Sequence, residues 1–207
     1  MNKMNIVGIG PGDRQYLTLL AIETIENSDV LVGSQRSLDL FEDIDAKFVP
    51  LQPRNIPQTV KEALGYLKEG LNVSILSTGD PGFSGMLKTM QKLSPETELE
   101  VIPGISSVQL ASARVQVPWD TANLITIHGG KAPTEDLLEK IDTKNKNIIL
   151  PNRHINELAE YLIEKGFSPD YDITICEKLS YPDEQVVQVT LEEARHMDFG
   201  YMCVVIL

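Results

Sequence analysis

Three short stretches of the 207-residue sequence combine glycine with an acid, a proline or serines, and each follows an apolar run. They are GIGPGD at residues 8–13, STGDPG at 77–82 and IPGISS at 102–107. Glycine adopts backbone conformations that other residues avoid, and it lets a ligand come close to the main chain. We therefore take these three turns as candidate binding elements and ask which ligand chemistry suits them.

The turns do not match the two common phosphate-binding patterns. The first turn has two glycines of the dinucleotide pattern G-x-G-x-x-G, but Asp13 stands where the third glycine is required. A phosphate loop needs a Lys and then a Ser or Thr after its second glycine, and neither of the first two turns has that order; Asp80 would also repel a phosphate. A ligand that is neutral or cationic near Asp80 fits better. S-adenosylmethionine has this chemistry, because it carries a sulfonium charge and no phosphate; a nucleotide-dependent enzyme is the alternative.

Strands that alternate with helices position these turns. A helix is expected at residues 56–69, for example, because Pro57 stands near its start and Gly70 lies just past its end. This alternation predicts an α/β fold with a mostly parallel sheet, in which ligands bind at the carboxyl ends of the strands. The three turns are therefore expected to converge on one edge of one sheet.

A second α/β domain is predicted for the remainder of the chain. Beyond Trp119 the sequence has more strand-like runs and fewer glycine turns, which is typical of a mixed sheet with some antiparallel pairing. The boundary is expected near Pro118, so residues 1–118 form an N-terminal domain and residues 119–207 form a C-terminal domain.

Composition narrows the classes of partner. The formal net charge of −12 opposes binding to nucleic acid or to an anionic membrane, so small molecules and proteins are the expected partners. Cys176 and Cys203 have no CxxC spacing and stand in apolar runs, which indicates buried reduced thiols. We find no signal-peptide pattern and no apolar run near the roughly 20 residues of a membrane span, so a cytoplasmic location is expected.

Four blocks in this order resemble the signature of the tetrapyrrole (corrin/porphyrin) methylase family. The blocks are Gly8–Asp13, Leu17–Gly33, Gly79–Pro81 and Pro103–Ser107. The resemblance covers the first 120 residues and continues loosely to the end of the chain. Narrower similarities point to members that methylate C5 of a corrin precursor; they lie at residues 32–36, 117–120, 128–131 and 179–184.

The resemblance implies two α/β domains with S-adenosylmethionine in the cleft between them. It implies C-methylation of a precorrin in cobalamin biosynthesis, a homodimer, and a separate C15-methylase and decarboxylase polypeptide. Another ring carbon as the target, or a noncatalytic module that binds cofactor or precorrin, are the alternatives. No resident metal is expected, because cobalt would arrive inside the substrate.

Site residues follow from the matching positions. The cofactor site implied by the resemblance comprises Ile9, Gly79, Asp80, Phe83, Ser106, Ser107 and Leu150. Ordinary core packing is the alternative for Phe83 and Leu150. The carboxylates of a precorrin need cations, and candidates beside turns or strand ends are Arg14, Arg36, Arg114, Lys131 and Arg153.

Two residues are candidates for a role at the reacting carbon. His128 ends an apolar strand directly before two glycines and is expected to face the cleft. Asp13 is expected to position substrate or to relay a proton, or alternatively to serve as the acid at a helix N-terminus.

Overall fold

The computed structural model describes residues 3–127, 135–142, 144–151, 154–200 and 202–207. Tertiary contacts divide the chain into two compact units, Met1–Ser106 and Ser107–Leu207. This division differs from the expected boundary near Pro118 by the helix α5 (Ser107–Val115), which contacts strand β10 (Cys203–Ile206) of the second unit. The predicted boundary between independently folding domains, near Pro118, stays a prediction.

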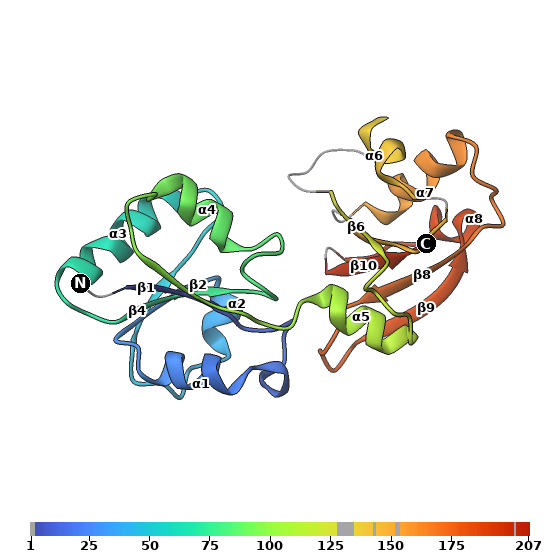
Figure 1. The fold of residues 1–207 in the computed structure, drawn as a ribbon. Helices are drawn as coiled ribbons and strands as arrows, with labels where there is room; N and C mark the ends of the chain where they lie inside the picture. The colour runs from blue at the N-terminus through green and yellow to red at the C-terminus, as the bar shows by residue number, and fades with distance from the viewer. Residues whose placement is uncertain (1–2, 128–134, 143, 152–153, 201) are drawn as a thin grey trace. The chain divides into compact units, whose positions relative to one another are not determined.

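The first unit is a parallel five-stranded sheet between two helical layers (Figure 1). The strand order is β3-β2-β4-β1-β5. Its strands are β1 (Met4–Gly8), β2 (Val30–Gly33), β3 (Lys47–Pro50), β4 (Val73–Ser77) and β5 (Leu99–Ile102). Its helices are the 3-10 helix η1 (Arg14–Tyr16), α1 (Leu19–Glu26), α2 (Gln35–Asp39), α3 (Ile56–Lys68) and α4 (Met86–Leu93).

Two apolar clusters hold this unit together. One cluster lies between the sheet and α3 and α4, and it includes Ile6, Ile75 and Met90. The other lies between the opposite face and α1 and α2, and it includes Val7 and Ile25. A parallel sheet that is covered on both faces needs strands with few polar residues, which explains the nearly continuous apolar runs of β1, β2 and β4.

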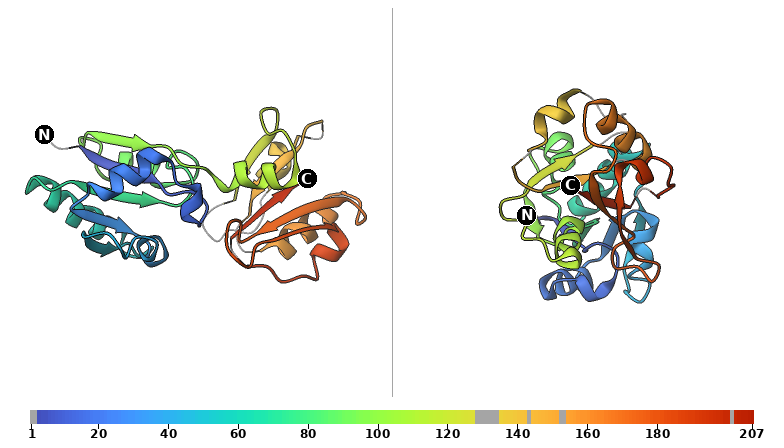
Figure 2. Two further views of the ribbon diagram at one scale, coloured as in Figure 1. Left: turned by 90° about the horizontal axis from the view of Figure 1, so that it is seen from below. Right: turned by 90° about the vertical axis from the view of Figure 1, so that its right-hand side faces the viewer.

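The second unit has a mixed five-stranded sheet in the order β6-β7-β10-β8-β9. Strands β6 and β7 are parallel, whereas β10 runs antiparallel to both β7 and β8, and β8 and β9 form an antiparallel ribbon (Figure 2). The strands are β6 (Asn123–Thr126), β7 (Asn147–Leu150), β8 (Asp172–Glu177), β9 (Gln185–Thr190) and β10. The further helices are α6 (Glu135–Lys140), α7 (Ile155–Glu164) and α8 (Leu191–Ala194).

Helices cover both faces of the second sheet. Residues of α6, α7 and α8 pack with Ile149 and Val205 in the apolar core of this unit, and α5 contacts β10. The expected fold class, with a parallel sheet and a mixed sheet, is therefore confirmed. In the part of the chain that the structure describes, no helix is both long and apolar enough to cross a membrane.

Candidate functional site

The three glycine turns converge on one edge of the first sheet, as the sequence predicts. They follow β1, β4 and β5, which are parallel neighbours, so their carboxyl ends lie side by side. The N–H of Gly79 donates to the carbonyl of Gly10 at 2.7 Å, and the N–H of Ile9 donates to the carbonyl of Ser77 at 3.0 Å. We call residues 8–13, 77–82 and 102–106 together the glycine rim.

Glycine is needed in the rim because the turns pack against one another, backbone to backbone. A Cβ atom added to Gly8 would lie 2.5 Å from the nitrogen of Gly104, and one added to Gly104 would lie 2.7 Å from the carbonyl carbon of Gly8. Gly79 has a φ of +70° and Gly10 a φ of +72°, a region that side chains disfavour. We expected these glycines to let a ligand approach the main chain closely. In the structure, the backbone of the neighbouring turn makes that close approach at Gly8 and Gly104.

The carboxylate of Asp80 ties the second turn to the third. Its Oδ1 accepts the N–H of Gly82 at 2.8 Å, and its Oδ2 accepts the N–H of Gly104 at 3.2 Å. Pro81 is buried, and its carbonyl accepts the N–H of Leu87 in α4. The negative charge at this edge is therefore held by backbone donors from two turns.

The other predicted cofactor residues of the first unit lie in or beside the rim. The side chain of Ile9 is 2% exposed and packs in the core under α1, so only its backbone can face a ligand. Phe83 follows the second turn and is partly buried. Ser106 is buried, and its Cα lies 3.6 Å from where a Cβ of Gly79 would be.

Asp13 and Arg14 have partners close to the first turn. The Oδ1 of Asp13 accepts the N–H of Gln15 at 2.8 Å and so caps η1, which is the structural role expected as its alternative. The guanidinium of Arg14 pairs with Asp43 at 2.8 Å and lies over the ring of Phe41. This contact lowers the pKa of Asp43, chiefly through the hydrogen bond.

Arg36 lies on α2, immediately beyond the carboxyl end of β2. Because β2 is the neighbour of β4 in the parallel sheet, this position is on the same edge as the glycine rim. Arg36 is partly buried, and its charge is on the last turn of its short helix. Arg36 is therefore, with Arg14 directly after the first turn, a predicted substrate cation that the first unit places beside the rim.

The remaining predicted residues belong to the second unit. Ser107 begins α5, Leu150 ends β7, and Arg114 lies near the end of α5. The guanidinium of Arg114 forms a two-pronged ion pair with Glu184, with Nε–Oε1 at 2.5 Å and Nη2–Oε2 at 3.2 Å. The sequence did not single out Glu184 as a partner. Three predicted residues lie outside the described part of the chain: His128, Lys131 and Arg153.

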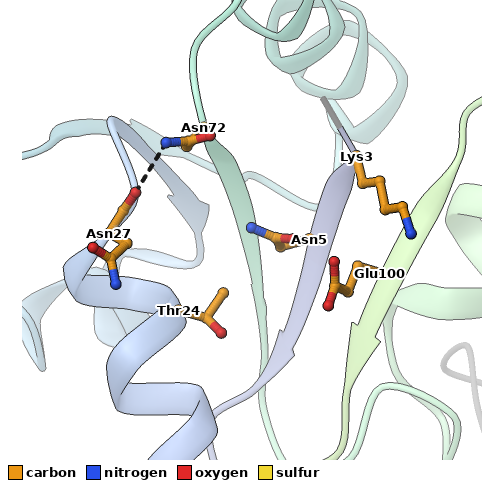
Figure 3. A pocket seen from close by; sticks show the side chains of 6 residues that line it. All are labelled: Lys3, Asn5, Thr24, Asn27, Asn72 and Glu100. Atoms are coloured by element: carbon orange, nitrogen blue, oxygen red, sulfur yellow. Dashed lines mark hydrogen bonds between the residues drawn. The ribbon is translucent and has the colours of Figure 1, made fainter. Parts of the chain in front are cut away.

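A separate polar hollow of about 330 Å³ lies at the opposite end of the first sheet (Figure 3). It lies beside the amino-terminal halves of β1 and β5, where Asn5 and Glu100 are register partners. Its lining is polar throughout and consists of Lys3, Asn5, Thr24, Asn27, Asn72 and Glu100. Because it lies away from the carboxyl ends of the strands, it is not the candidate site.

The rim fits S-adenosylmethionine better than it fits a phosphate. The three turns supply backbone donors and acceptors, serine hydroxyls and the carboxylates of Asp13 and Asp80, and their sequences contain no lysine or arginine. An anionic phosphate would meet Asp80 without a compensating cation from the turns, whereas a sulfonium or ammonium group would be attracted to it. Within the described residues, no group of three or more His, Cys, Asp or Glu side chains is arranged to hold a metal.

The chain belongs to the tetrapyrrole (corrin/porphyrin) methylases, because the model of that family matches residues 3–195. A Methanocaldococcus jannaschii protein, named probable cobalt-precorrin-7 C(5)-methyltransferase, is 42% identical over 208 residues. That match covers 96% of this chain and 94% of the relative. The predicted family is thus confirmed.

Solved structures show the same fold. Precorrin-6Y methylase (CbiE) from Archaeoglobus fulgidus matches 99% of this chain and 97% of its own, with a TM-score of 0.76 and 23% identity. Uroporphyrin-III C-methyl transferase from Thermus thermophilus, complexed with S-adenyl homocysteine, matches 100% of this chain and 92% of its own. Its TM-score is 0.80 and its identity 21%.

Proposed function

We propose that the protein is an S-adenosylmethionine-dependent methyltransferase that methylates C5 of cobalt-precorrin-7 in cobalamin biosynthesis. The observation that carries the proposal is the 42% identity, over 96% of the chain, to the Methanocaldococcus jannaschii protein of that name. The rim supports the cofactor, because three converging turns present backbone groups and the Asp80 carboxylate without any basic side chain. Methylation of another ring carbon is the alternative.

The bound cofactor would supply a methyl group on a positively charged sulfur. The chain must hold this group in line with the ring carbon, at roughly 3–3.5 Å, and exclude water. Such positioning lowers the activation barrier by several kcal/mol. Asp80 would place a negative charge near the sulfonium or ammonium group. The backbone of Ile9 and Gly79 and the hydroxyls of Ser106 and Ser107 would hold the remainder, with Phe83 and Leu150 as apolar contacts.

The substrate is a polycarboxylate, so an acidic protein must bind it through local cations. We propose Arg36 for this role, since it lies on the rim edge, together with Arg14, Lys131 and Arg153. We propose His128 and Asp13 for proton handling at the reacting carbon. We further propose that the enzyme is a cytoplasmic homodimer that acts with a separate C15-methylase and decarboxylase.

The test is turnover with cobalt-precorrin-7 and S-adenosylmethionine labelled with ¹³C in its methyl group. We expect one labelled methyl group at C5, located by NMR, and S-adenosylhomocysteine as the second product. Label at another carbon would support the alternative methylase. Binding of both ligands with no transfer would indicate a noncatalytic binding module, and calorimetric binding of nucleotides in place of S-adenosylmethionine would overturn the assignment of the rim.

A further inference from the structure

The polar hollow at the amino edge of the first sheet has a floor that core packing does not explain. Ser74 of β4, Asn5 of β1 and Glu100 of β5 are register partners, so their side chains form one polar row on one face of the sheet. The next row on that face, two residues further along the strands, is apolar and buried; it consists of Leu76, Val7 and Ile102. A parallel sheet that is covered on both faces has mostly apolar strands, so the polar row needs a reason of its own.

A directed chain of hydrogen bonds fixes the orientation of the Asn5 amide. The hydroxyl of Ser28 donates to the carbonyl of Thr24 at 2.7 Å, so it must accept in its 2.7 Å contact with Ser74. Ser74 thus donates its only proton to Ser28 and can only accept from Asn5, whose Nδ2 lies 3.2 Å away. The amide oxygen of Asn5 therefore points away from Ser74. Figure 3 shows the nitrogen of Asn5 on the β4 side and Glu100 on the other side.

The neutral side chains on the walls of the hollow also direct their donors at the protein. The amide nitrogen of Asn27 donates to the carbonyl of Glu23 at 2.7 Å, and that of Asn72 donates to the carbonyl of Asn27 at 3.3 Å. The hydroxyl of Thr24 donates to the carbonyl of Leu20 at 2.7 Å, which leaves only its lone pairs. The groups that these residues offer to a ligand are therefore mainly oxygen acceptors.

The charges around the hollow favour a cation. Lys3 is the cation among the lining residues, and its ammonium pairs with Glu98 at 3.1 Å. This hydrogen bond raises the pKa of Lys3, and the negative charge of Glu100 adds to the effect. Two carboxylates thus share one ammonium, and within the described residues the Glu100 carboxylate has no hydrogen bond or ion pair of its own. The C-terminal end of α1 also borders the hollow; it carries the negative end of the helix dipole and has no basic residue in its last turn.

We propose that this hollow is a second ligand site, which binds a small organic cation with N–H donors, a primary alkylammonium ion. The ammonium group donates to the amide oxygen of Asn5 and to the carboxylate of Glu100, which are neighbours in the polar row. The volume of about 330 Å³ is within the range of small-molecule pockets and is large enough for a short alkyl chain. The site lies wholly in the first unit, at the edge opposite the glycine rim, so it does not depend on the proposed function.

The experiment is an NMR titration of the ¹⁵N-labelled full chain with butylammonium chloride at constant ionic strength. We expect the side-chain amide signals of Asn5, Asn27 and Asn72 to shift and to reach saturation. Tetramethylammonium has the same charge but no N–H donor, and it should leave these signals in place. Glu100 is exposed, so Glu100→Gln should fold normally, and it should weaken butylammonium binding about tenfold because a charged acceptor is lost.

Two further variants separate a specific site from general electrostatics. Glu160→Gln removes the same charge from an exposed position of α7, in the second unit, and should bind butylammonium as the wild type does. Lys3→Met removes the ammonium that competes for the carboxylates, and it should bind butylammonium more tightly than the wild type. Weaker binding in Lys3→Met would mean that the ligand needs a cationic partner, as an anion or a zwitterion does, and would overturn the inference.

The remaining outcomes are equally decisive. The inference is wrong if the asparagine signals do not saturate, if tetramethylammonium shifts them as much, or if Glu160→Gln weakens binding as much as Glu100→Gln. Tighter binding of calcium chloride at the same signals would mean that the oxygens hold a metal ion and would also overturn it. The titration uses neither cofactor nor corrin, so a protein that binds butylammonium but transfers no methyl group would refute the proposed function while this inference stands.

Discussion

Asp80 is a residue on which the geometry of the glycine rim depends. Its two carboxylate oxygens accept N–H groups from Gly82 and Gly104, which belong to different turns. Hydrogen bonds to a charged acceptor are about twice as strong as neutral ones, and here they join segments that are 24 residues apart. The same side chain supplies the negative charge of the proposed cofactor site, so structure and binding should fail together when it is changed.

The substitution Asp80→Asn should reduce both the stability of the protein and its affinity for S-adenosylmethionine. Asparagine keeps one acceptor oxygen, but its NH2 group faces the second N–H, so one hydrogen bond and the negative charge are lost. We expect the free energy of unfolding to fall by about 1–2 kcal/mol. The Kd of S-adenosylmethionine should rise about tenfold, which corresponds to 1.4 kcal/mol. Urea unfolding and calorimetry measure the two effects.

Asp29→Asn is the matched control for that substitution. Asp29 also accepts a backbone N–H, that of Asn72 at 2.7 Å, but just ahead of β2 and β4, at the amino edge of the same sheet. The Asp29→Asn variant should lose some stability and keep its affinity for S-adenosylmethionine. Unchanged affinity in Asp80→Asn would remove the carboxylate from the cofactor site.

At the scale of elements, the rim exists because three turns can touch. The parallel order β4-β1-β5 brings their carboxyl ends together, and glycine at positions 8 and 104 lets the main chains meet without side chains between them. Side chains of the turns then hold the starts of the neighbouring helices. Asp13 caps η1, and the hydroxyl of Ser77 accepts the N–H of Met86 at the start of α4.

Gly104→Ala should therefore be destabilising. The new methyl group would meet the backbone of Gly8 and Gly79, which cannot move as the end of a flexible side chain can. We expect a loss of about 2 kcal/mol or more in the free energy of unfolding, as for other overpacked sites. Thermal and urea denaturation provide the measurement.

Gly65→Ala tests the opposite case in the same unit. Gly65 lies inside α3, and a Cβ there would meet no atom within 4 Å. Because alanine favours the helix over glycine, this variant should gain about 0.5–1 kcal/mol. Equal stabilities of the two variants would show that the turns are not packed as described.

At the scale of the whole molecule, the net charge limits how the substrate can be bound. A chain with a formal net charge of −12 must bind a polycarboxylate, so long-range attraction cannot guide the substrate and local cations must hold it. The family resemblance adds the expectation that two copies assemble. Each unit has its own apolar core, so dimer formation is not needed to complete either one.

Sedimentation equilibrium at micromolar concentration tests the assembly. We expect a species of twice the 23.0 kDa chain mass, with no change when S-adenosylhomocysteine is added. A single species of one chain mass over this range would contradict the proposed homodimer and leave the assignment of the rim unaffected.

Several features were predictable from the sequence because they depend on neighbours along the chain. Apolar periodicity located the strands and most helices, and Pro57 and Gly70 bracket α3, since proline suits the first turn of a helix and glycine the position after its last. The order of the turns also identified the family, which the match over residues 3–195 confirms. The segment 34–55, by contrast, received no helix or strand prediction, and the structure has α2 and β3 there.

Other features were decided only by the tertiary structure, because they join residues that the order of the strands brings together. Asp80 with Gly104 and Arg114 with Glu184 are pairs 24 and 70 residues apart, and no local pattern connects them. Spacing along the chain cannot show which charges will be neutralised by a partner, so Arg114 looked like a substrate ligand. The sequence determined which segments could bind; the packing of the sheets decided which side chains remain available to do so.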